Sequence, residues 1–366
     1  DIKEGGGVTS RNLKLIEYLE KDKAENYIIT TQNNHKRIKL SFLNQSRILY
    51  LRTIYIGKYP LPIPKFIRLI KLIKKADIVH FSNFWHVLNI YAFFVCKLYS
   101  KKYVLCPAGA LKIFGKSKFL KYLYRIIIGN NIINNSSRII AITQKEKKEI
   151  INLGIQKEKI VTIPNGIDLY KRKKSNYKYK ETLKKYKPFI LFMGRLNYIK
   201  GPDILLKAFI EVSKEFPSYN LLFAGPDDGL AIHLKRDAKK YKINKNIYFL
   251  GFVNNLQKDY LYKNATLLVI PSRSEAMSLV VLEAGINGLF SIFTNVCGLE
   301  FIEKNNLGTS VDVNHHSIAN AIKSILKKST KDYKKKELIK FIKNNYNWNL
   351  IAKKYLDVFE NCNENN

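Results

Sequence analysis

Acidic residues are scarce in this sequence. Its 366 residues include 29 Asp and Glu against 64 Lys and Arg, which gives a formal net charge of +35 at pH 7. A field of this sign attracts polyanions such as nucleic acids, anionic lipid headgroups and phosphorylated substrates, and it does not choose among them. The lysines are scattered and form no dense basic tail, so a compositional drift towards Lys, Ile, Asn and Tyr explains the charge equally well.

Cysteine and long apolar runs are also scarce. The four cysteines lie far apart, with no C-x-x-C pair and no histidine spacing typical of a metal site, so we expect free thiols in a reducing cytoplasm. No signal peptide is recognised, and no run of about 18 apolar residues lacks polar interruptions. The nearest approach, residues 78–99, contains two His, two Asn and a Ser, and it predicts a buried strand followed by a buried helix.

Apolar residues are plentiful enough for packed cores. They make up 46% of the chain, and the length favours two domains of roughly 150 to 200 residues each. Short β-branched or aromatic runs alternate with amphipathic helical patterns, which is typical of α/β domains with parallel sheets. The predicted strands lie within residues 76–82, 102–109, 136–143, 158–166, 187–195, 219–226, 245–253, 265–272 and 289–295.

The domain limits follow from changes in composition. The polar, basic stretch 169–187 predicts a linker between an N-terminal domain, residues 1–168, and a second domain, residues 188–344. Residues 345–366 predict a C-terminal helix. The chain starts DIKEGGG, without Met and with a glycine loop where a first strand should already have ended, so we expect the first strand to be missing. Two doubly wound domains imply a ligand cleft at the carboxyl ends of their strands.

A strand end in the second domain carries two cations. The strand within 187–195 ends in Gly194 and Arg195, and Lys200 and Gly201 precede a helix that begins near Pro202. Cations beside the backbone N–H groups of a helix start suit a diphosphate. Taken alone, Arg195 and Lys200 are somewhat better explained as two of the 64 basic residues, on a solvated loop.

Two glutamates flank a second helix start. In SRSEAMSLVVLEAG, residues 272–285, Glu275 follows a predicted strand and Glu283 lies inside the apolar run. We expect the helix to begin near Ser278, whose hydroxyl suits an N-terminal cap. Glu283 then shares a face with Leu279 and Val280. Two carboxylates and two cations are thus predicted to converge.

These motifs resemble a known family. PNGID (164–168), GRLNYIKG (194–201), LLFAGP (221–226) and above all EAMSLVVLE (275–283) are similar to the retaining GT-B glycosyltransferases called group 1 or family 4. The resemblance covers nearly the whole chain. It implies two Rossmann-like doubly wound domains facing a central cleft, an N-terminal acceptor domain, a C-terminal nucleotide-sugar donor domain, and a final helix that crosses back to the first domain.

The resemblance also implies residue roles. Arg195 and Lys200 would neutralise the donor diphosphate, Glu275 would hold hydroxyls of the sugar, and Glu283 would accept hydrogen bonds from the ribose. The helix start would meet the phosphates through backbone N–H groups. Backbone of the first domain's glycine loop would approach the donor phosphate, and the GFV segment would flank the base. The donor-binding residues expected besides Glu283 are Gly7, Gly194, Phe252, Val253, Ser278, Leu279 and Val280.

The implied reaction moves a hexose from a nucleotide diphosphate sugar to a glycan or lipid-linked acceptor in cell-surface polysaccharide or glycolipid synthesis. A leaving phosphate oxygen would take the acceptor proton. The chain has no D-x-D motif, so neither a metal nor another cofactor is expected. One position departs from the family, because Ala108 stands where many relatives carry His or Arg.

The expected location is cytoplasmic, with a peripheral contact on the inner face of the membrane. Residues 114–130 combine Lys and Arg with Phe, Leu and Tyr and form a candidate contact with anionic lipid. A basic outer face on a core helix explains them equally well. The alternatives are a non-catalytic GT-B relative, a GT-B enzyme such as a nucleotide-sugar 2-epimerase, or a basic protein binding nucleic acid or another anionic surface. No nucleic-acid recognition motif supports nucleic acid as a partner.

Overall fold

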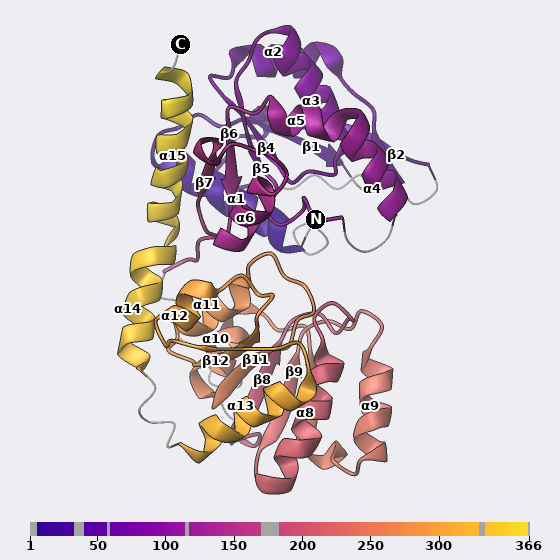
Figure 1. Cartoon of the computed structure of the whole chain (residues 1–366), viewed down its shortest axis with the longest axis vertical. Coiled ribbons are helices and arrows are strands. Elements are labelled where there is room, and N and C mark those ends of the chain that lie inside the picture. Colours follow the sequence, from indigo (N-terminus) through magenta and orange to yellow (C-terminus); the bar gives the residue numbers. More distant parts are fainter. Residues whose placement is uncertain are drawn as a thin grey trace. The chain divides into compact units, whose positions relative to one another are not determined.

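The computed structural model describes residues 6–32, 40–56, 59–113, 117–169, 183–328 and 334–364. The chain divides into two compact units (Figure 1). Unit 1 comprises Asp1–Gly166 and Trp348–Asn366, and unit 2 comprises Ile167–Asn347. Most of the proposed linker, residues 169–187, lies outside the described residues.

Unit 2 is built on a six-stranded parallel sheet with strand order β10-β9-β8-β11-β12-β13. The strands are β8 (Phe189–Met193), β9 (Asn220–Ala224), β10 (Ile247–Gly251), β11 (Leu267–Ile270), β12 (Ser291–Thr294) and β13 (Thr309–Val311). All residues of β8, β11 and β12 are buried, as in parallel strands that helices cover on both faces. The five predicted strands of the second half are therefore confirmed, and β13 was missed.

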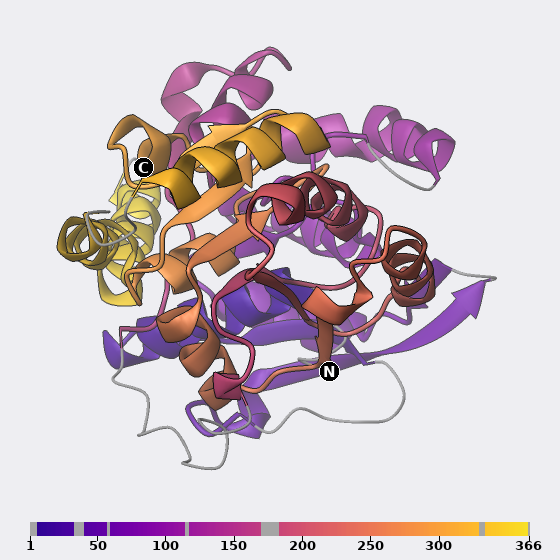
Figure 2. The ribbon, with the colours of Figure 1, turned by 90° about the horizontal axis from the view of Figure 1, so that it is seen from below.

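The helices of unit 2 begin where the sequence favours it. In α8 (Pro202–Glu215), Pro202 opens the first turn and Asp203 complements the helix dipole. Leu205, Phe209 and Val212 recur at helical spacing and lie fully buried in the core of the unit. Helix α13 (His315–Lys327) packs along α8 and shares this core (Figure 2). Unit 2 also contains α9 (Ala231–Lys240), η4 (Asn244–Asn246), α10 (Asn255–Asn264), α11 (Leu279–Gly285), α12 (Glu300–Lys304) and α14 (Lys335–Tyr346).

Unit 1 contains two sheets. The four-stranded parallel sheet β4-β5-β6-β7 holds the predicted strands of the first half: β4 (Val79–Ser82), β5 (Tyr103–Cys106), β6 (Arg138–Ala141) and β7 (Ile160–Thr162). The smaller sheet, which was not predicted, comprises β1 (Ile28–Gln32), β2 (Ile48–Ile56) and β3 (Tyr59–Pro62). Strand β2 pairs parallel with β1 and antiparallel with β3.

Helical segments of unit 1 pack against its sheets, and those over residues 66–75, 87–98 and 144–151 share a core with β2, β4, β5 and β6. The helical segments are α1 (Gly6–Lys21), η1 (Gln45–Arg47), α2 (Phe66–Lys75), α3 (Val87–Leu98), α4 (Lys118–Tyr124), η2 (Arg125–Gly129), α5 (Asn130–Asn134), α6 (Gln144–Ile151), η3 (Lys157–Lys159) and α15 (Trp348–Glu364). Helix α2 buries Leu69 and Ile73, whereas Phe66 and Ile67 are exposed.

The C-terminal helix α15 belongs to unit 1, which confirms that the chain crosses back. It packs against α1, where the rings of Tyr18 and Trp348 stack with centroids 6.3 Å apart. The indole also lies against Gly166, so close that a Cβ there would come within 2.5 Å of it. The last helix thus closes the core of the first domain.

Candidate functional site in the second unit

Two loops at the carboxyl edge of the unit 2 sheet are joined by a charged pair. Lys200 lies between β8 and α8, and Glu275 follows β11. The Lys200 ammonium donates to Glu275 Oε1, and the buried Ser272 hydroxyl donates to the same oxygen at 3.3 Å. The Glu275 side chain is only 13% exposed and that of Lys200 27%. The structure therefore brings together two of the predicted catalytic residues.

Arg273 holds the same two loops in place. Its guanidinium makes a bidentate ion pair with Asp203, with N–O distances of 2.8 and 2.5 Å, and stacks 3.9 Å from the centre of the Tyr198 ring. It also donates to the Tyr198 carbonyl at 2.7 Å. Sequence reasoning missed this clamp. A bidentate guanidinium–carboxylate pair fixes the orientation of both side chains as well as contributing electrostatic attraction. Arg273 is therefore a positioning residue for Lys200 and Glu275.

Gly201 lets the loops approach each other. Its φ of +68° lies in the left-handed region, and a Cβ at this position would sit 2.2 Å from the Pro271 carbonyl oxygen. Any side chain would force the two loops apart. Gly201, the last residue of GRLNYIKG, is thus required by the loop contact that places Lys200 beside Glu275.

Arg195 faces a different carboxylate. Its side chain is 61% exposed, and one guanidinium nitrogen lies 3.6 Å from Asp228 Oδ2. Asn197 donates to that oxygen at 2.8 Å and accepts from the Lys200 backbone N–H at 3.0 Å. The Arg195 side of the loop is therefore linked to Lys200 through Asn197. Neither Asp228 nor Asn197 was singled out from the sequence.

Helix α11 begins after Ser278, as predicted, but the predicted side-chain cap is wrong. Ser278 lies in extended backbone and its hydroxyl makes no capping hydrogen bond. The buried Oγ has no hydrogen-bond partner, and the Ser278 N–H donates to the Cys297 carbonyl at 3.1 Å. Leu279 and Val280, the first residues of the helix, are partly buried, while Val281 and Leu282 pack in the core.

The side chain of Glu283, on α11, contacts two residues of α10. Its Oε2 accepts a hydrogen bond from the Tyr262 hydroxyl at 3.0 Å and lies 2.5 Å from the Lys258 ammonium. Tyr262 and Lys258 are four residues apart and share one face of α10. Lys258 was missed from the sequence. Of the four predicted charges, Lys200 and Glu275 pair with each other, whereas Arg195 pairs with Asp228 and Glu283 with Lys258.

The remaining predicted donor residues lie at three other places. Gly194 follows β8, and its N–H donates to the Ala224 carbonyl at 2.9 Å. Phe252 is 64% exposed, whereas the neighbouring Val253 is buried. In unit 1, Gly7 is exposed in the first turn of α1, with open space where a side chain would be. The predicted glycine loop is therefore helical at Gly6 and Gly7, and its first residue, Gly5, lies outside the described residues.

A buried carboxylate shapes the backbone around Ala108 in unit 1. Ala108 has a φ of +53°, which is strained for a residue with a side chain. Glu146 accepts from the Gly109 N–H at 2.6 Å and from the Ile142 N–H at 2.7 Å, so it ties the loop after β5 to the loop after β6. Burial raises the pKa of Glu146, although the two backbone donors oppose the shift.

The Arg11 cluster, comprising Arg11, Cys106, Glu146 and Tyr355, lies in the interior of unit 1. Arg11 of α1 donates to Cys106 Sγ at 3.0 Å and to the Tyr355 hydroxyl of α15. His80 packs edge-on against the Tyr355 ring, and its Nε2 is buried without a hydrogen-bond partner. Burial, and then the nearby Arg11 charge, lower the pKa of His80 to about 3, so this histidine stays neutral.

Two family profiles match consecutive parts of the chain. The profile described as Glycosyltransferase Family 4 matches residues 5–171, and the profile Glycosyl transferases group 1 matches residues 173–348. The second match contains the Lys200–Glu275 pair, Arg195 and Glu283.

Individual proteins agree with these profiles. An uncharacterized glycosyltransferase of Methanocaldococcus jannaschii, MJ1607, is 28% identical over 236 residues, which are 62% of this chain and 60% of that protein. The Escherichia coli O-antigen biosynthesis glycosyltransferase WbnH is 33% identical over 166 residues, 44% of this chain and 43% of WbnH. The alignments thus span about half the length of these curated relatives.

The fold agrees as well. Anabaena HepE superposes with a TM-score of 0.76 at 16% identity, over 98% of this chain and 97% of HepE. Together the motifs, the two parallel α/β units and the profiles show that the chain belongs to the group 1, or family 4, glycosyltransferases and has the GT-B fold.

Proposed function

We propose that this protein transfers a hexose from a nucleotide diphosphate sugar to a glycan or lipid-linked acceptor, with retention of the anomeric configuration. The observation that carries the proposal is the Lys200–Glu275 ion pair at the carboxyl edge of the unit 2 sheet. Ligands of open α/β sheets bind at this edge. A cation suits a diphosphate there, and a carboxylate beside it suits the hydroxyls of a sugar.

Lys200 and Arg195 are proposed to stabilise the leaving diphosphate. Charge accumulates on the diphosphate as the glycosidic bond breaks, and fixed cations lower the energy of that state. Lys200 is held by Glu275 and by its backbone bond to Asn197. Arg195 is mostly exposed and its ion-pair contact with Asp228 is long, at 3.6 Å, so it has the freedom to turn towards a phosphate.

Glu275 is proposed to orient the sugar. The carboxylate is largely buried and already receives the Ser272 hydroxyl and the Lys200 ammonium, so its position is fixed before the donor binds. A leaving phosphate oxygen takes the acceptor proton in this mechanism. The protein then contributes position and charge rather than a general base.

The other donor contacts are proposed around the start of α11. Backbone N–H groups in the first turn of a helix have no intrahelical acceptor, and the Ser278 hydroxyl beside them is buried and unpartnered. Leu279 and Val280 supply such N–H groups to the phosphates. Glu283, oriented by Tyr262 and Lys258, accepts from the ribose hydroxyls.

The remaining donor contacts are proposed to use backbone and apolar surface. Phe252 and Val253 flank the base, while the backbones of Gly194 and Gly7 approach the phosphates without side chains in the way. No metal is assigned a role, because the chain has no D-x-D motif.

A thermal-shift screen with UDP, GDP and ADP tests the donor site. We expect one nucleoside diphosphate to raise the melting temperature, because a ligand that binds only the folded protein stabilises it. Hydrolysis assays with the matching nucleotide sugars then identify the hexose. If no nucleotide changed the melting temperature, the donor site would be wrongly assigned. Binding without turnover of any sugar would favour the non-catalytic alternative.

The acceptor is proposed to be a growing cell-surface polysaccharide or a glycolipid. WbnH is named for O-antigen biosynthesis, and HepE, which shares the fold, forms complexes with UDP and with UDP-glucose. These relatives make UDP-glucose the first donor to assay. The acceptor and the sugar themselves are to be identified by activity.

An exposed apolar and basic surface in unit 1 supports the proposal of a lipid-linked acceptor and of a peripheral position on the cytoplasmic face of the membrane. Residues 117–129, the α4–η2 segment, expose five large apolar side chains: Phe119, Leu120, Tyr122, Ile126 and Ile127. The same segment carries Lys118, Lys121 and Arg125 and no acidic residue. In the described part of the chain, no helix combines the length and apolar character needed to cross a bilayer. Exposed apolar side chains insert into the membrane interface, and basic residues beside them attract anionic lipid headgroups.

Vesicle co-sedimentation tests this surface. We expect the protein to bind vesicles containing an anionic phospholipid at low salt, and the double variant Phe119→Ser/Ile127→Ser to remain in solution. The control Ile232→Ser removes an equally exposed apolar residue from α9 of unit 2. Equal binding by the double variant and the control would contradict the proposal.

A further inference from the structure

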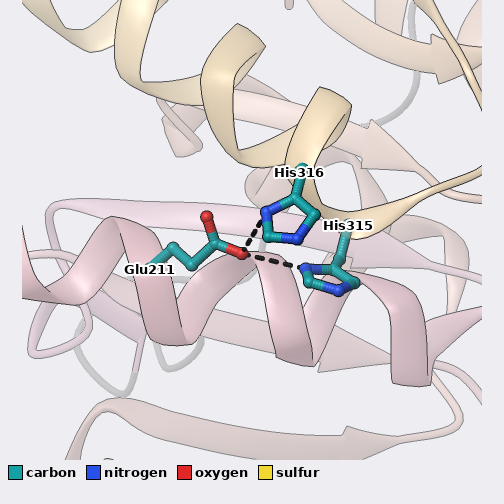
Figure 3. A group of neighbouring side chains, drawn as sticks. All are labelled: Glu211, His315 and His316. Atoms are coloured by element: carbon teal, nitrogen blue, oxygen red, sulfur yellow. Dashed lines mark hydrogen bonds and ion pairs between the residues drawn. The ribbon is translucent and has the colours of Figure 1, made fainter.

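Two adjacent histidines and a glutamate form a compact cluster on the surface of unit 2 (Figure 3). Glu211 comes from α8, and His315 and His316 are the first two residues of α13. His315 Nδ1 lies 2.9 Å and His316 Nδ1 3.1 Å from the same carboxylate oxygen, Glu211 Oε1. Figure 3 shows both imidazole rings turned towards that oxygen. All three candidate ligand atoms lie within 4.8 Å of one another.

The two helices that carry the cluster are firmly placed. Phe209 and Val212 of α8 are buried in the same core as Ile318 and Ile322 of α13. The start of α13 is fixed by Asn314, whose side-chain oxygen accepts from the Ser317 N–H at 2.8 Å. The cluster therefore does not depend on a loose loop to bring its groups together, and little conformational entropy is lost when they act as a unit.

The distances fit a small transition-metal ion. Ligand atoms about 2.0–2.1 Å from a tetrahedral zinc are separated from each other by roughly 3.3 Å. The two measured separations need to lengthen by only a few tenths of an ångström, which side-chain rotation allows. Two imidazole nitrogens and one carboxylate oxygen are ligands for Zn²⁺, Co²⁺ or Ni²⁺, whereas Mg²⁺ and Ca²⁺ prefer oxygen ligands alone.

We propose that Glu211, His315 and His316 bind a divalent transition-metal ion of the zinc type, with the remaining position open to water. The ion takes the place of the protons that now join the two imidazoles to the carboxylate. It links the side chains of α8 and α13 directly and adds to the core packing between them.

This site is separate from the donor site. Glu211 lies ten residues beyond Gly201, or roughly 15 Å along α8. The Lys200–Glu275 pair is at the start of that helix. The ion is therefore assigned a stabilising role in unit 2 and no role in glycosyl transfer.

Titration of the whole protein with Co²⁺, after chelator treatment and removal of any purification tag, tests the proposal. We expect visible absorption bands of Co²⁺ with nitrogen and oxygen ligands, and competition by Zn²⁺. The variants Glu211→Gln, His315→Asn and His316→Asn should each weaken Co²⁺ binding at least about tenfold. The matched control His233→Asn, on α9, should bind Co²⁺ like the parent.

A second measurement needs no spectroscopic signal. At one fixed concentration, Zn²⁺ should raise the melting temperature of the parent and of His233→Asn, and raise those of His315→Asn and His316→Asn less. The proposal is overturned if the cluster variants keep the parent's Co²⁺ affinity, or if His233→Asn loses as much as they do. The same conclusion follows if Zn²⁺ stabilises all the proteins equally.

Discussion

The two units hold charged residues in contrasting ways. In unit 1, Arg11 and Glu146 are each 4% exposed, and Glu146 binds backbone N–H groups of two loops. At the candidate site of unit 2, the paired charges join side chains from different loops and helices and are partly open to solvent. Their exposed side-chain fractions range from 13% for Glu275 to 61% for Arg195.

This difference separates a structural role from a binding role. A buried charged group that is hydrogen-bonded to backbone N–H groups cannot exchange these partners for a ligand. Removing it leaves unpaired polar atoms in the interior. A partly exposed ion pair can exchange its partner for a ligand group at small cost. The Arg11 cluster is therefore expected to respond in stability measurements, and the pairs of unit 2 in donor binding and turnover.

The largest expected effect is on turnover in unit 2. Lys200→Ala removes the cation proposed for the leaving diphosphate, and we expect kcat/KM to fall by roughly 10²–10³-fold. Steady-state kinetics with the matching nucleotide sugar measures this. Lys207→Ala, at an exposed position on the adjoining helix α8, is the control and should retain parental activity. Parental activity in Lys200→Ala would assign the residue to the solvated surface.

In unit 1, Glu146→Ala should lower stability. The substitution leaves the Gly109 and Ile142 N–H groups without their acceptor, and we expect the free energy of unfolding to fall by about 2–4 kcal/mol. Denaturant unfolding measures the change. Glu149→Ala, on the same helix and less buried, should cost less than about 0.5 kcal/mol. If the two variants were equally stable, the buried carboxylate would not hold the loops.

A smaller effect is expected at the ribose end of the donor site. Glu283→Gln keeps the shape of the side chain but weakens its acceptor strength and its pairing with Lys258. We expect the Kd for the nucleoside diphosphate to rise about tenfold, with kcat changed less than threefold. Calorimetric titration and kinetics on the same preparation distinguish the two quantities. A large fall in kcat with unchanged affinity would place Glu283 at the sugar instead.

The smallest effect is expected for the most exposed ion pair of the candidate site. Asp228→Asn removes the carboxylate 3.6 Å from Arg195, where both side chains are about half exposed or more. Pairs of this kind contribute little to stability, so the melting temperature should stay within about 1–2 °C of the parent. Scanning calorimetry measures this. A shift as large as that of Glu146→Ala would remove the distinction between the two units.

Local sequence signals anticipated part of the molecule. Buried parallel strands are short apolar runs ending at Gly, Pro or a small polar residue, so β4–β12 could be located from the sequence. Strands β1–β3 were missed because only part of their surface is apolar and buried, and β13 because it has three partly exposed residues. The α/β class and the crossing helix did not depend on those elements.

Only part of the candidate site could be predicted from local sequence patterns. Lys200 and Glu275 lie in spaced motifs, so their meeting could be anticipated. Asp203 with Arg273, Lys258 with Glu283, and Glu146 with two backbone N–H groups are brought together by tertiary packing alone. No periodicity marks such partners. The Ser278 cap was wrong because the helix start is held by the backbone bond to Cys297 instead.

The central claim is that Glu275 acts on the sugar and not on the nucleotide. The most direct test compares Glu275→Ala with the parent in two measurements: turnover of the matching nucleotide sugar, and the Kd of the nucleoside diphosphate that gives the largest thermal shift. We predict that turnover falls by at least about 100-fold while the Kd changes less than threefold. An equal loss of both would contradict the role assigned to this residue.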